Sequence, residues 1–219
     1  MDDHMTFVKP LPKDLQQRYL TWKTTEYAEK QRLLEDLVDN GQKPRAMVIS
    51  CCDSRVHVTS IFGAEQGDFF IHRNIANVIP PFAPDGLNHG TSAAIEYAVS
   101  VLEVKELIVL GHSQCGGVKA CDDYCSNGSD IKENTQFIGN WIGILEPAHK
   151  RVAHIKDEEE RTTALEKENV KQSLSNVMEF PFVHAAVDAG TLNLHGLWHD
   201  IRSGDVEYYD ADTDAFKAI

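Results

Sequence analysis

Apolar residues near the start of the chain recur at the spacing of a helix. Between residues 11 and 39 most of them fall three or four positions apart with charged residues between, at Leu15, Tyr19, Trp22, Leu33, Leu34 and Leu37. Side chains three and four apart share one face of a helix, so this pattern predicts one or two amphipathic helices. The pair Asn40-Gly41 predicts where the helical segment ends.

Short apolar runs further along the chain have the length of strands. Residues 46–50 include the β-branched residues that are typical of a buried parallel strand, and residues 68–72 and 106–110 predict two more strands. Another strand is predicted at residues 191–198. A turn signal follows it, and we expect residues 206–209 to pair back as a hairpin.

Helical patterns lie between these strands. We expect helices over residues 90–103, from Val118 onwards, and over residues 148–179, with residues 157–161 facing solvent. The polar composition of residues 122–135 predicts a loop.

The alternation of strands with helices predicts the α/β class, with a mainly parallel β-sheet flanked by helices. A chain of 219 residues is long for one small domain and short for two. We therefore expect a single domain overall, with an N-terminal helical arm at residues 1–40 and the α/β domain at residues 41–219.

The charge of the chain excludes several kinds of partner. The formal net charge is −13 and the lysines and arginines are not clustered, whereas nucleic acids and anionic membranes bind basic surfaces.

No stretch approaches the roughly 20 apolar residues that span a bilayer. The first 15 residues are polar and carry no secretion signal, so we expect a cytoplasmic protein.

The cysteines point to chemistry rather than to disulfides. Their number is five, and an odd count without a secretion signal argues against a disulfide framework. In a reducing compartment such cysteines are more often metal ligands or catalytic groups. We expect Cys52, Cys121 and Cys125 to be small buried apolar side chains.

Two motifs follow two of the predicted parallel strands. Residues 51–55 read Cys-Cys-Asp-Ser-Arg, and residues 111–117 read Gly-His-Ser-Gln-Cys-Gly-Gly. In an open α/β sheet, ligands bind at the carboxyl ends of the strands. The two motifs therefore predict a single site.

The cysteines and histidine of these motifs can hold a zinc ion. His112 and Cys115 are three residues apart, so a tight turn can point both at one ion, and Cys51 supplies a third ligand. A catalytic zinc keeps its fourth position for water and makes a hydroxide nucleophile near neutral pH. Two thiolates and one imidazole leave such a site formally neutral. We expect Asp53 to orient the nucleophile and Arg55 to keep Asp53 ionised.

Spacing alone leaves other interpretations open. Asp53 and Arg55 can be a purely structural ion pair. The zinc can be structural and closed, with Cys52 or Cys121 as its fourth ligand.

A serine hydrolase is a second class of interpretation. Residues 111–115 resemble a nucleophile elbow with Ser113 as nucleophile, although Cys115 stands where the motif has glycine. Asp188 or Asp200 would then orient His195 or His199.

Taken together, four segments resemble the β-class carbonic anhydrases. They are residues 51–56 (CCDSRV), 72–77 (HRNIAN), 93–97 (AAIEY) and 111–117 (GHSQCGG). Their order and spacing both fit, and the likeness extends from about residue 41 to about residue 209. The combination is specific although each segment is short.

The resemblance implies an activity and a role for each matching residue. The enzyme would hydrate carbon dioxide reversibly to bicarbonate and a proton, by attack of zinc-bound hydroxide. Cys51, His112 and Cys115 would bind Zn2+, and Asp53 and Arg55 would form the catalytic dyad. The residues that the resemblance places around the substrate are Gln42, Phe70, Ile75 and Tyr97, with the backbone at Gly116 binding the substrate oxygens.

The resemblance also implies an assembly and a regulatory state. Family members are homodimers or homotetramers in which an N-terminal helical arm lies across the partner, and residues 11–39 fit that arm. Members with a regulatory bicarbonate site carry tryptophan three residues before the first zinc cysteine, whereas this chain has Val48. We therefore expect an open zinc site at neutral pH.

Overall fold

The computed structural model describes residues 7–84 and 89–219. The chain divides between Gln42 and Lys43 into two compact units, and each is described by itself.

The N-terminal unit contains two helices, α1 (Lys13–Thr24) and α2 (Glu26–Asn40), separated at Thr25. The second helix ends at Gly41, whose φ of 76° lies in the region that glycine favours. The helices carry exposed apolar side chains, namely Leu15, Tyr19, Leu20, Trp22 and Val38. Two helices ending at Asn40 confirm the pattern read from the sequence.

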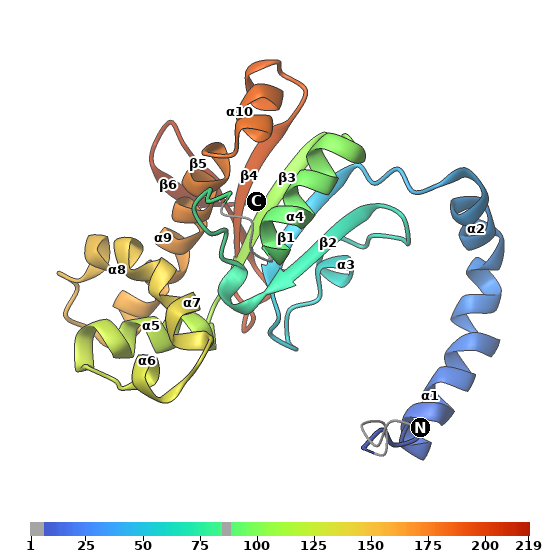
Figure 1. Cartoon of the computed structure of the whole chain (residues 1–219), viewed down its shortest axis with the longest axis horizontal. Helices are drawn as coiled ribbons and strands as arrows, with labels where there is room; N and C mark the ends of the chain where they lie inside the picture. The colour runs from blue at the N-terminus through green and yellow to red at the C-terminus, as the bar shows by residue number, and fades with distance from the viewer. Residues whose placement is uncertain (1–6, 85–88) are drawn as a thin grey trace. The chain divides into compact units, whose positions relative to one another are not determined.

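The second unit is built on a mixed sheet of six strands in the order β2-β1-β3-β4-β5-β6 (Figure 1). Neighbouring pairs among β1 to β4 are parallel, and β5 and β6 are added antiparallel at one edge. The strand bounds are β1 Ala46–Cys51, β2 Phe69–Asn74, β3 Glu106–His112, β4 Asn193–His199, β5 Val206–Asp210 and β6 Ala215–Ala218. This sheet and its flanking helices confirm the predicted α/β class; strand β6 was not predicted.

The helices of this unit flank the sheet. Their bounds are α3 Val58–Ile61, α4 Gly90–Glu96, α5 Gly116–Asn127, α6 Ile131–Asn134, α7 Ile138–Ile142, α8 Glu146–Val152, α9 Glu158–Met178 and α10 Pro181–Asp188. Helix α4 continues as a π-helical turn over Tyr97–Val101. The longest helix, α9, packs on β3 and β4. In the described part of the chain, no helix is both long enough and apolar enough for a bilayer crossing.

Close approach of α9 to the sheet depends on two glycines. A Cβ atom at Gly111 would lie 2.7 Å from Val170 Cγ2, and one at Gly196 would lie 2.9 Å from Val170 Cγ1. Such contacts are shorter than packed side chains tolerate. Glycine at both positions therefore lets α9 lie directly on β3 and β4.

One prediction about the helices is wrong, and two others, on solvent exposure and on the cysteines, are wrong in part. Residues 122–135 are not a loop, because α5 runs to Asn127, Gly128 caps it with a φ of 67°, and α6 follows. Polarity misled here, because a helix with one buried face can be polar elsewhere. Residues 157–160 are exposed as predicted, whereas Arg161 is buried. Of the three cysteines expected to be buried, only Cys121 is; Cys52 and Cys125 are exposed.

Candidate metal centre

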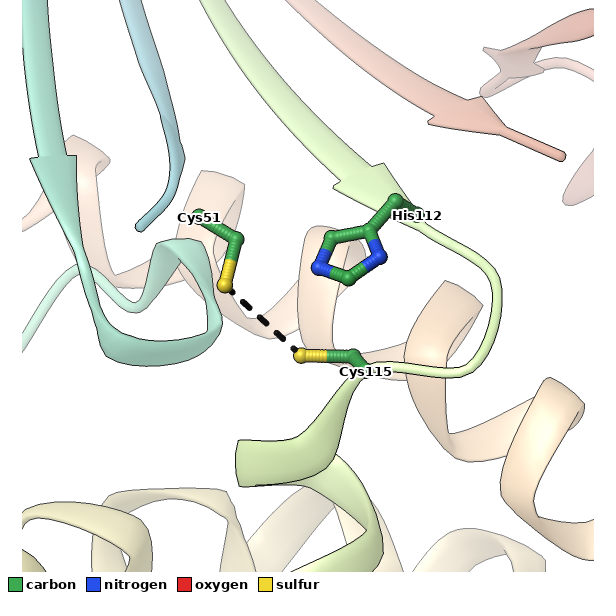
Figure 2. A group of neighbouring side chains, drawn as sticks. All are labelled: Cys51, His112 and Cys115. Atoms are coloured by element: carbon green, nitrogen blue, oxygen red, sulfur yellow. Dashed lines mark hydrogen bonds between the residues drawn. The ribbon is translucent and has the colours of Figure 1, made fainter. Parts of the chain in front are cut away.

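Three ligand side chains meet at the carboxyl ends of β1 and β3 (Figure 2). Cys51 is the last residue of β1, His112 is the last residue of β3, and Cys115 is the N-cap residue of α5. Because β1 and β3 are adjacent parallel strands, their ends lie side by side. The ligand atoms of the three residues lie within 4.8 Å of one another, and all three residues are buried.

His112 presents a nitrogen that lacks a partner. Its Nδ1 lies 2.8 Å from the carbonyl oxygen of Ser113, so Nδ1 carries the proton and donates it. The other nitrogen, Nε2, is buried without a hydrogen-bond partner. A buried polar atom without a partner is costly. The lone pair of Nε2 therefore fits a metal ion between it and the two sulfurs.

The two sulfurs lie 3.9 Å apart, within hydrogen-bond distance for sulfur. The contact with Cys115 lowers the pKa of Cys51, and the same contact raises the pKa of Cys115. Thiolates are the form in which cysteine binds metals. Two sulfurs and one imidazole nitrogen form a donor set that zinc accepts.

Asp53 and Arg55 form a bidentate pair beside the ligands. Asp53 Oδ1 accepts from Arg55 Nε at 2.9 Å, and Oδ2 accepts from Arg55 Nη2 at 2.7 Å. The hydrogen bonds from Arg55 hold the pKa of Asp53 well below its usual range. Arg55 Nη2 also donates to the carbonyl of Gln114 at 3.1 Å. Arg55 therefore links the two motifs that the sequence singled out.

Arg73 holds the first motif from the neighbouring strand β2. Its Nε donates to the Cys51 carbonyl at 2.9 Å, and its Nη2 donates to the carbonyls of Asp53 at 2.7 Å and Val56 at 3.0 Å. Residue-level reasoning assigned no role to Arg73, although it lies within one of the quoted segments. A long-range contact of this kind has no local signal in the sequence.

A row of buried polar side chains on α9 holds the segments around the site. We call Glu166, Asn169, Ser173 and Asn176 the polar row of α9. Asn169 donates to the Ala76 carbonyl at 2.7 Å, and Asn176 donates to the Ile79 carbonyl at 2.7 Å. Glu166 Oε1 accepts from the Cys115 N–H at 3.0 Å. Sequence reasoning missed this row; its signal was polar residues at the spacing of one helix face.

The contacts of Ser113 do not support the hydrolase interpretation. Ser113 Oγ donates to Asp200 Oδ1 at 2.9 Å and accepts from the Ile201 N–H at 2.9 Å, so its partners are not imidazoles. His195 lies against Glu106 at 2.8 Å, and His199 Nδ1 lies 3.2 Å from the Asp205 carbonyl. Among the described residues, neither His195 nor His199 is therefore in place as a general base for Ser113.

A closed structural zinc site would need a fourth protein ligand, and neither Cys52 nor Cys121 supplies one. Cys52 is exposed and is not part of the group of ligand atoms. Cys121 Sγ lies 3.9 Å from Cys125 Sγ, its neighbour on α5, and is also outside the group. Among the described residues, a tetrahedral zinc held by Cys51, His112 and Cys115 would therefore have no fourth ligand from a cysteine.

The predicted substrate residues fall in different places. Ile75 lines an apolar cavity of about 680 Å3 with Cys52, Asn74 and Trp141. Phe70 and Tyr97 form an aromatic pair with ring centroids 5.7 Å apart, and they do not line that cavity. Gly116 begins α5 next to Cys115. Gln42 belongs to the N-terminal unit.

Comparison with known families gives a match over most of this unit. The family profile described as carbonic anhydrase matches residues 46–206. The chain is 38% identical over 198 residues to beta carbonic anhydrase 3 of Arabidopsis thaliana, covering 89% of this chain and 75% of that protein. It is 35% identical over 188 residues to a carbonic anhydrase of Synechocystis sp., covering 84% of this chain and 66% of that protein.

Solved structures give the same result for the fold. The structure of the beta-carbonic anhydrase CcaA superposes with a TM-score of 0.86 at 32% identity, covering 94% of this chain and 91% of that one. One of two tetrameric beta-carbonic anhydrases from Sordaria macrospora superposes with a TM-score of 0.75 at 30% identity, covering 89% and 94%.

Proposed function

Since this chain belongs to the β-class carbonic anhydrases, we propose that it catalyses the reversible hydration of carbon dioxide to bicarbonate and a proton. The observation that carries the proposal is the unpartnered Nε2 of His112, which is buried beside the sulfurs of Cys51 and Cys115. It is the arrangement expected of a metal-binding hydratase site rather than of a packed core.

Zinc is the cofactor that these residues fit. Cys51, His112 and Cys115 would hold it, and their thiolate and neutral imidazole donors match its preferences. When bound, zinc would lower the pKa of a coordinated water and so supply a hydroxide nucleophile near neutral pH.

Asp53 would orient the nucleophile, and Arg55 would keep the Asp53 carboxylate ionised and in position. A carboxylate has about four acceptor positions. The N–H of Arg55, its Nε and its Nη2 use three of them, two on Oδ1 and one on Oδ2. The remaining position on Oδ2 can accept a hydrogen bond from the attacking oxygen. Because the pKa of Asp53 is well below its usual range, the carboxylate stays ionised at neutral pH.

Apolar and amide groups would bind the substrate. Ile75 offers an apolar wall to a nonpolar linear molecule. Phe70 and Tyr97 do not line the cavity at Ile75 within this chain. On the strength of the family resemblance, we assign Phe70, Tyr97 and Gln42 to the substrate site as residues contributed partly by a second copy of the chain, with Gln42 giving a hydrogen bond to a substrate oxygen. The N–H of Gly116 lies in the first turn of α5, where backbone donors are free of helix bonds and can meet the charge that develops on bicarbonate.

The oligomeric state and location are part of the proposal. The related Sordaria macrospora enzymes are described as tetrameric, and we propose that this chain is a homodimer or homotetramer. Light scattering after size-exclusion chromatography measures its mass directly.

A cytoplasmic location stays a prediction, supported by five cysteines that are all free; one related protein of Arabidopsis thaliana is described as chloroplastic.

Stopped-flow carbon dioxide hydration tests the activity, with zinc content measured on the same samples. We expect fast hydration and one zinc per chain in the wild type, and loss of both in Cys115→Ser. Bound zinc without hydration would contradict the proposal and indicate a structural ion. Ester hydrolysis that disappears in Ser113→Ala would indicate a serine hydrolase instead.

A further inference from the structure

We propose that Glu166 is the positioning residue of the metal centre: its buried carboxylate holds the turn that carries His112 and Cys115 in the geometry that binds the ion. The inference rests on the proposed zinc site. It concerns how the ligands are held before any metal arrives.

Glu166 joins three elements at the point where the ligands meet. Its carboxylate comes from α9, and Oε1 accepts from the backbone N–H of Cys115 at 3.0 Å. Oε2 accepts from Trp198 Nε1 at 3.1 Å. Trp198 lies on β4, opposite Gly111 of β3 in the sheet register. The two oxygens therefore tie the turn after β3 to the neighbouring strand.

The turn needs such an anchor because its backbone is unusual. Gln114, between the two ligands, has a φ of 55°, in the left-handed region that non-glycine residues rarely adopt. Such conformations persist when surrounding contacts determine them. The Cys115 N–H contact acts on the residue immediately after Gln114. It fixes the direction in which the Cys115 side chain leaves the backbone, and so the position of Sγ.

Burying the Glu166 carboxylate costs free energy, and a positioning role accounts for its presence at this site. Glu166 is 2% exposed, and none of the ion pairs among the described residues includes it. Its contacts named above are with N–H donors. A buried carboxylate without a cationic partner carries a large desolvation cost. The rest of the polar row of α9 uses neutral asparagine and serine side chains to hold backbone groups.

The chemistry of the two donors explains why an acid stands at this position. Both partners of Glu166 are N–H groups, so both of its side-chain oxygens must accept. A glutamine has one oxygen and one NH2 group, and the NH2 would face an N–H donor. Glu166→Gln keeps the size of the side chain but releases either the Cys115 turn or Trp198.

The test is metal binding to the full chain, measured with Zn2+ in competition with a chromophoric chelator and with Co2+ by absorption spectroscopy. We expect Glu166→Gln to weaken zinc binding about 10- to 100-fold, the usual effect of losing a contact that orients a metal ligand. We also expect its thiolate-to-cobalt bands to shift at saturating Co2+, because Cys115 Sγ is no longer held in place.

Two control variants separate positioning from general stability. Asn176→Ala removes a buried member of the same row that holds Ile79 rather than a ligand, so it should lower the melting temperature without moving the cobalt bands. Glu159→Gln removes an exposed charge on the same helix and should match the wild type in both measurements.

Trp198→Phe keeps the test decisive if Glu166→Gln fails to fold. It removes only the donor to Oε2, so we expect a smaller shift of the same cobalt bands. Wild-type zinc affinity and unchanged bands in whichever variant folds would overturn the role of Glu166. Failure of the wild type to bind zinc or cobalt would instead refute the zinc site on which the inference rests.

Discussion

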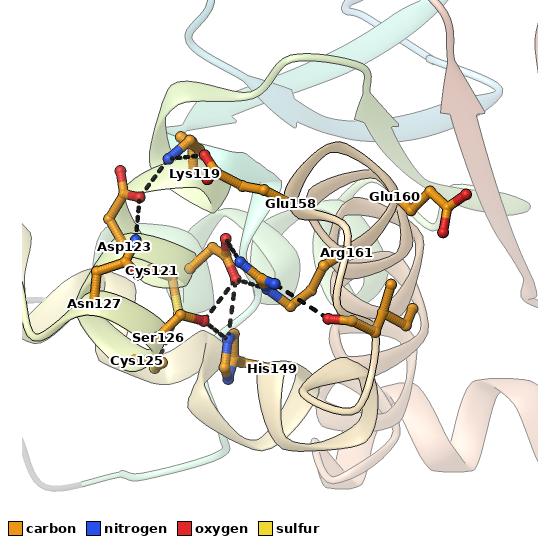
Figure 3. Close-up of polar contacts among 12 residues, drawn as sticks. Lys119, Cys121, Asp123, Cys125, Ser126, Asn127, His149, Glu158, Glu160 and Arg161 are labelled. Carbon is orange, nitrogen blue, oxygen red and sulfur yellow. Dashed lines mark hydrogen bonds and ion pairs between the residues drawn. The ribbon is translucent and has the colours of Figure 1, made fainter.

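Two buried polar clusters in the second unit differ in how completely their polar atoms are paired. In the metal centre, His112 Nε2 has no partner. In the second cluster, Asp122 is fully buried, and its carboxylate accepts from Arg161 Nε at 2.7 Å and from Arg161 Nη2 at 3.0 Å. Figure 3 labels Arg161 and the neighbouring Ser126 and His149. Ser126 donates to the same carboxylate at 3.2 Å, and His149 Nε2 lies 3.1 Å from it.

The difference separates a binding role from a structural one. Native proteins pair most of their buried polar atoms, so an unpaired imidazole nitrogen that lies beside two cysteine sulfurs indicates a metal ligand. The Asp122 cluster is complete within the chain and joins α5, α8 and α9. We therefore expect changes at the metal centre to affect function more than stability, and changes at Asp122 to do the reverse.

The largest effect on function should come from His112→Leu. The leucine cannot bind a metal, so we expect zinc to be lost and hydration to fall to the uncatalysed rate. The substitution also removes the unpartnered nitrogen and keeps most of the side-chain volume, so the zinc-free protein should be about as stable as zinc-free wild type. Calorimetry and zinc analysis check both points. A large drop in the melting temperature of the zinc-free variant would contradict the comparison.

Asp53→Asn should separate metal binding from catalysis. Asparagine keeps the size of the side chain but presents an NH2 group and loses the charged pair with Arg55. We expect kcat to fall about 100- to 10,000-fold, the range for a group that acts on a proton in the transition state, with zinc content unchanged. Loss of zinc in this variant would show that Asp53 acts on the ligands instead.

Asp122→Ala should be mainly a stability variant. It leaves the guanidinium of Arg161 buried without its partner, which typically costs about 3–5 kcal/mol in the free energy of unfolding. Urea unfolding measures the loss, and zinc content of the folded fraction should stay at the wild-type level. An unchanged free energy of unfolding would mean that water enters and solvates Arg161.

The same cluster should make stability depend on acid. Burial raises the pKa of Asp122, but the contacts from Arg161 outweigh burial and the net shift is downward. A lowered pKa contributes stability that is present above the unfolded value of about 3.9 and is lost as the pH falls through the folded value. Urea unfolding at pH 6 and pH 3 should therefore show a smaller difference between wild type and Asp122→Ala at pH 3.

The smallest effect should come from the exposed edge of this cluster. Lys119 pairs with Asp123 and Glu158 on the surface, and its side chain is 40% exposed. Exposed pairs contribute about 0–1 kcal/mol and are screened by salt. Lys119→Gln should change the free energy of unfolding by less than about 1 kcal/mol in 0.15 M salt. A larger loss would mean that these contacts are coupled to Asp122.

The local sequence pattern was enough to predict the central strands of the sheet and the reactive residues at their carboxyl ends. The strands near residues 46–50 and 106–110 follow from apolar runs, and both motifs lie at strand ends, where parallel strands bring side chains together. Cysteine and histidine in those motifs indicated a metal because both motifs follow neighbouring strands, whereas their spacing alone left a structural ion pair, a closed zinc site and a hydrolase open. Their grouping within 4.8 Å is a geometric fact that agrees with this prediction.

Tertiary structure alone decided which side chains, distant in the sequence, contact the residues at those strand ends and in the Asp122 cluster. Glu166 is 51 residues from Cys115, and Arg161 is 39 residues from Asp122. Such pairs depend on how closely α9 packs on the sheet and on α5. The exposure of Cys52 and Cys125 was decided in the same way. The amino-acid sequence by itself determined the elements and the reactive residues, because these depend on neighbours along the chain; the partners of Glu166 and Asp122 depend on neighbours in space.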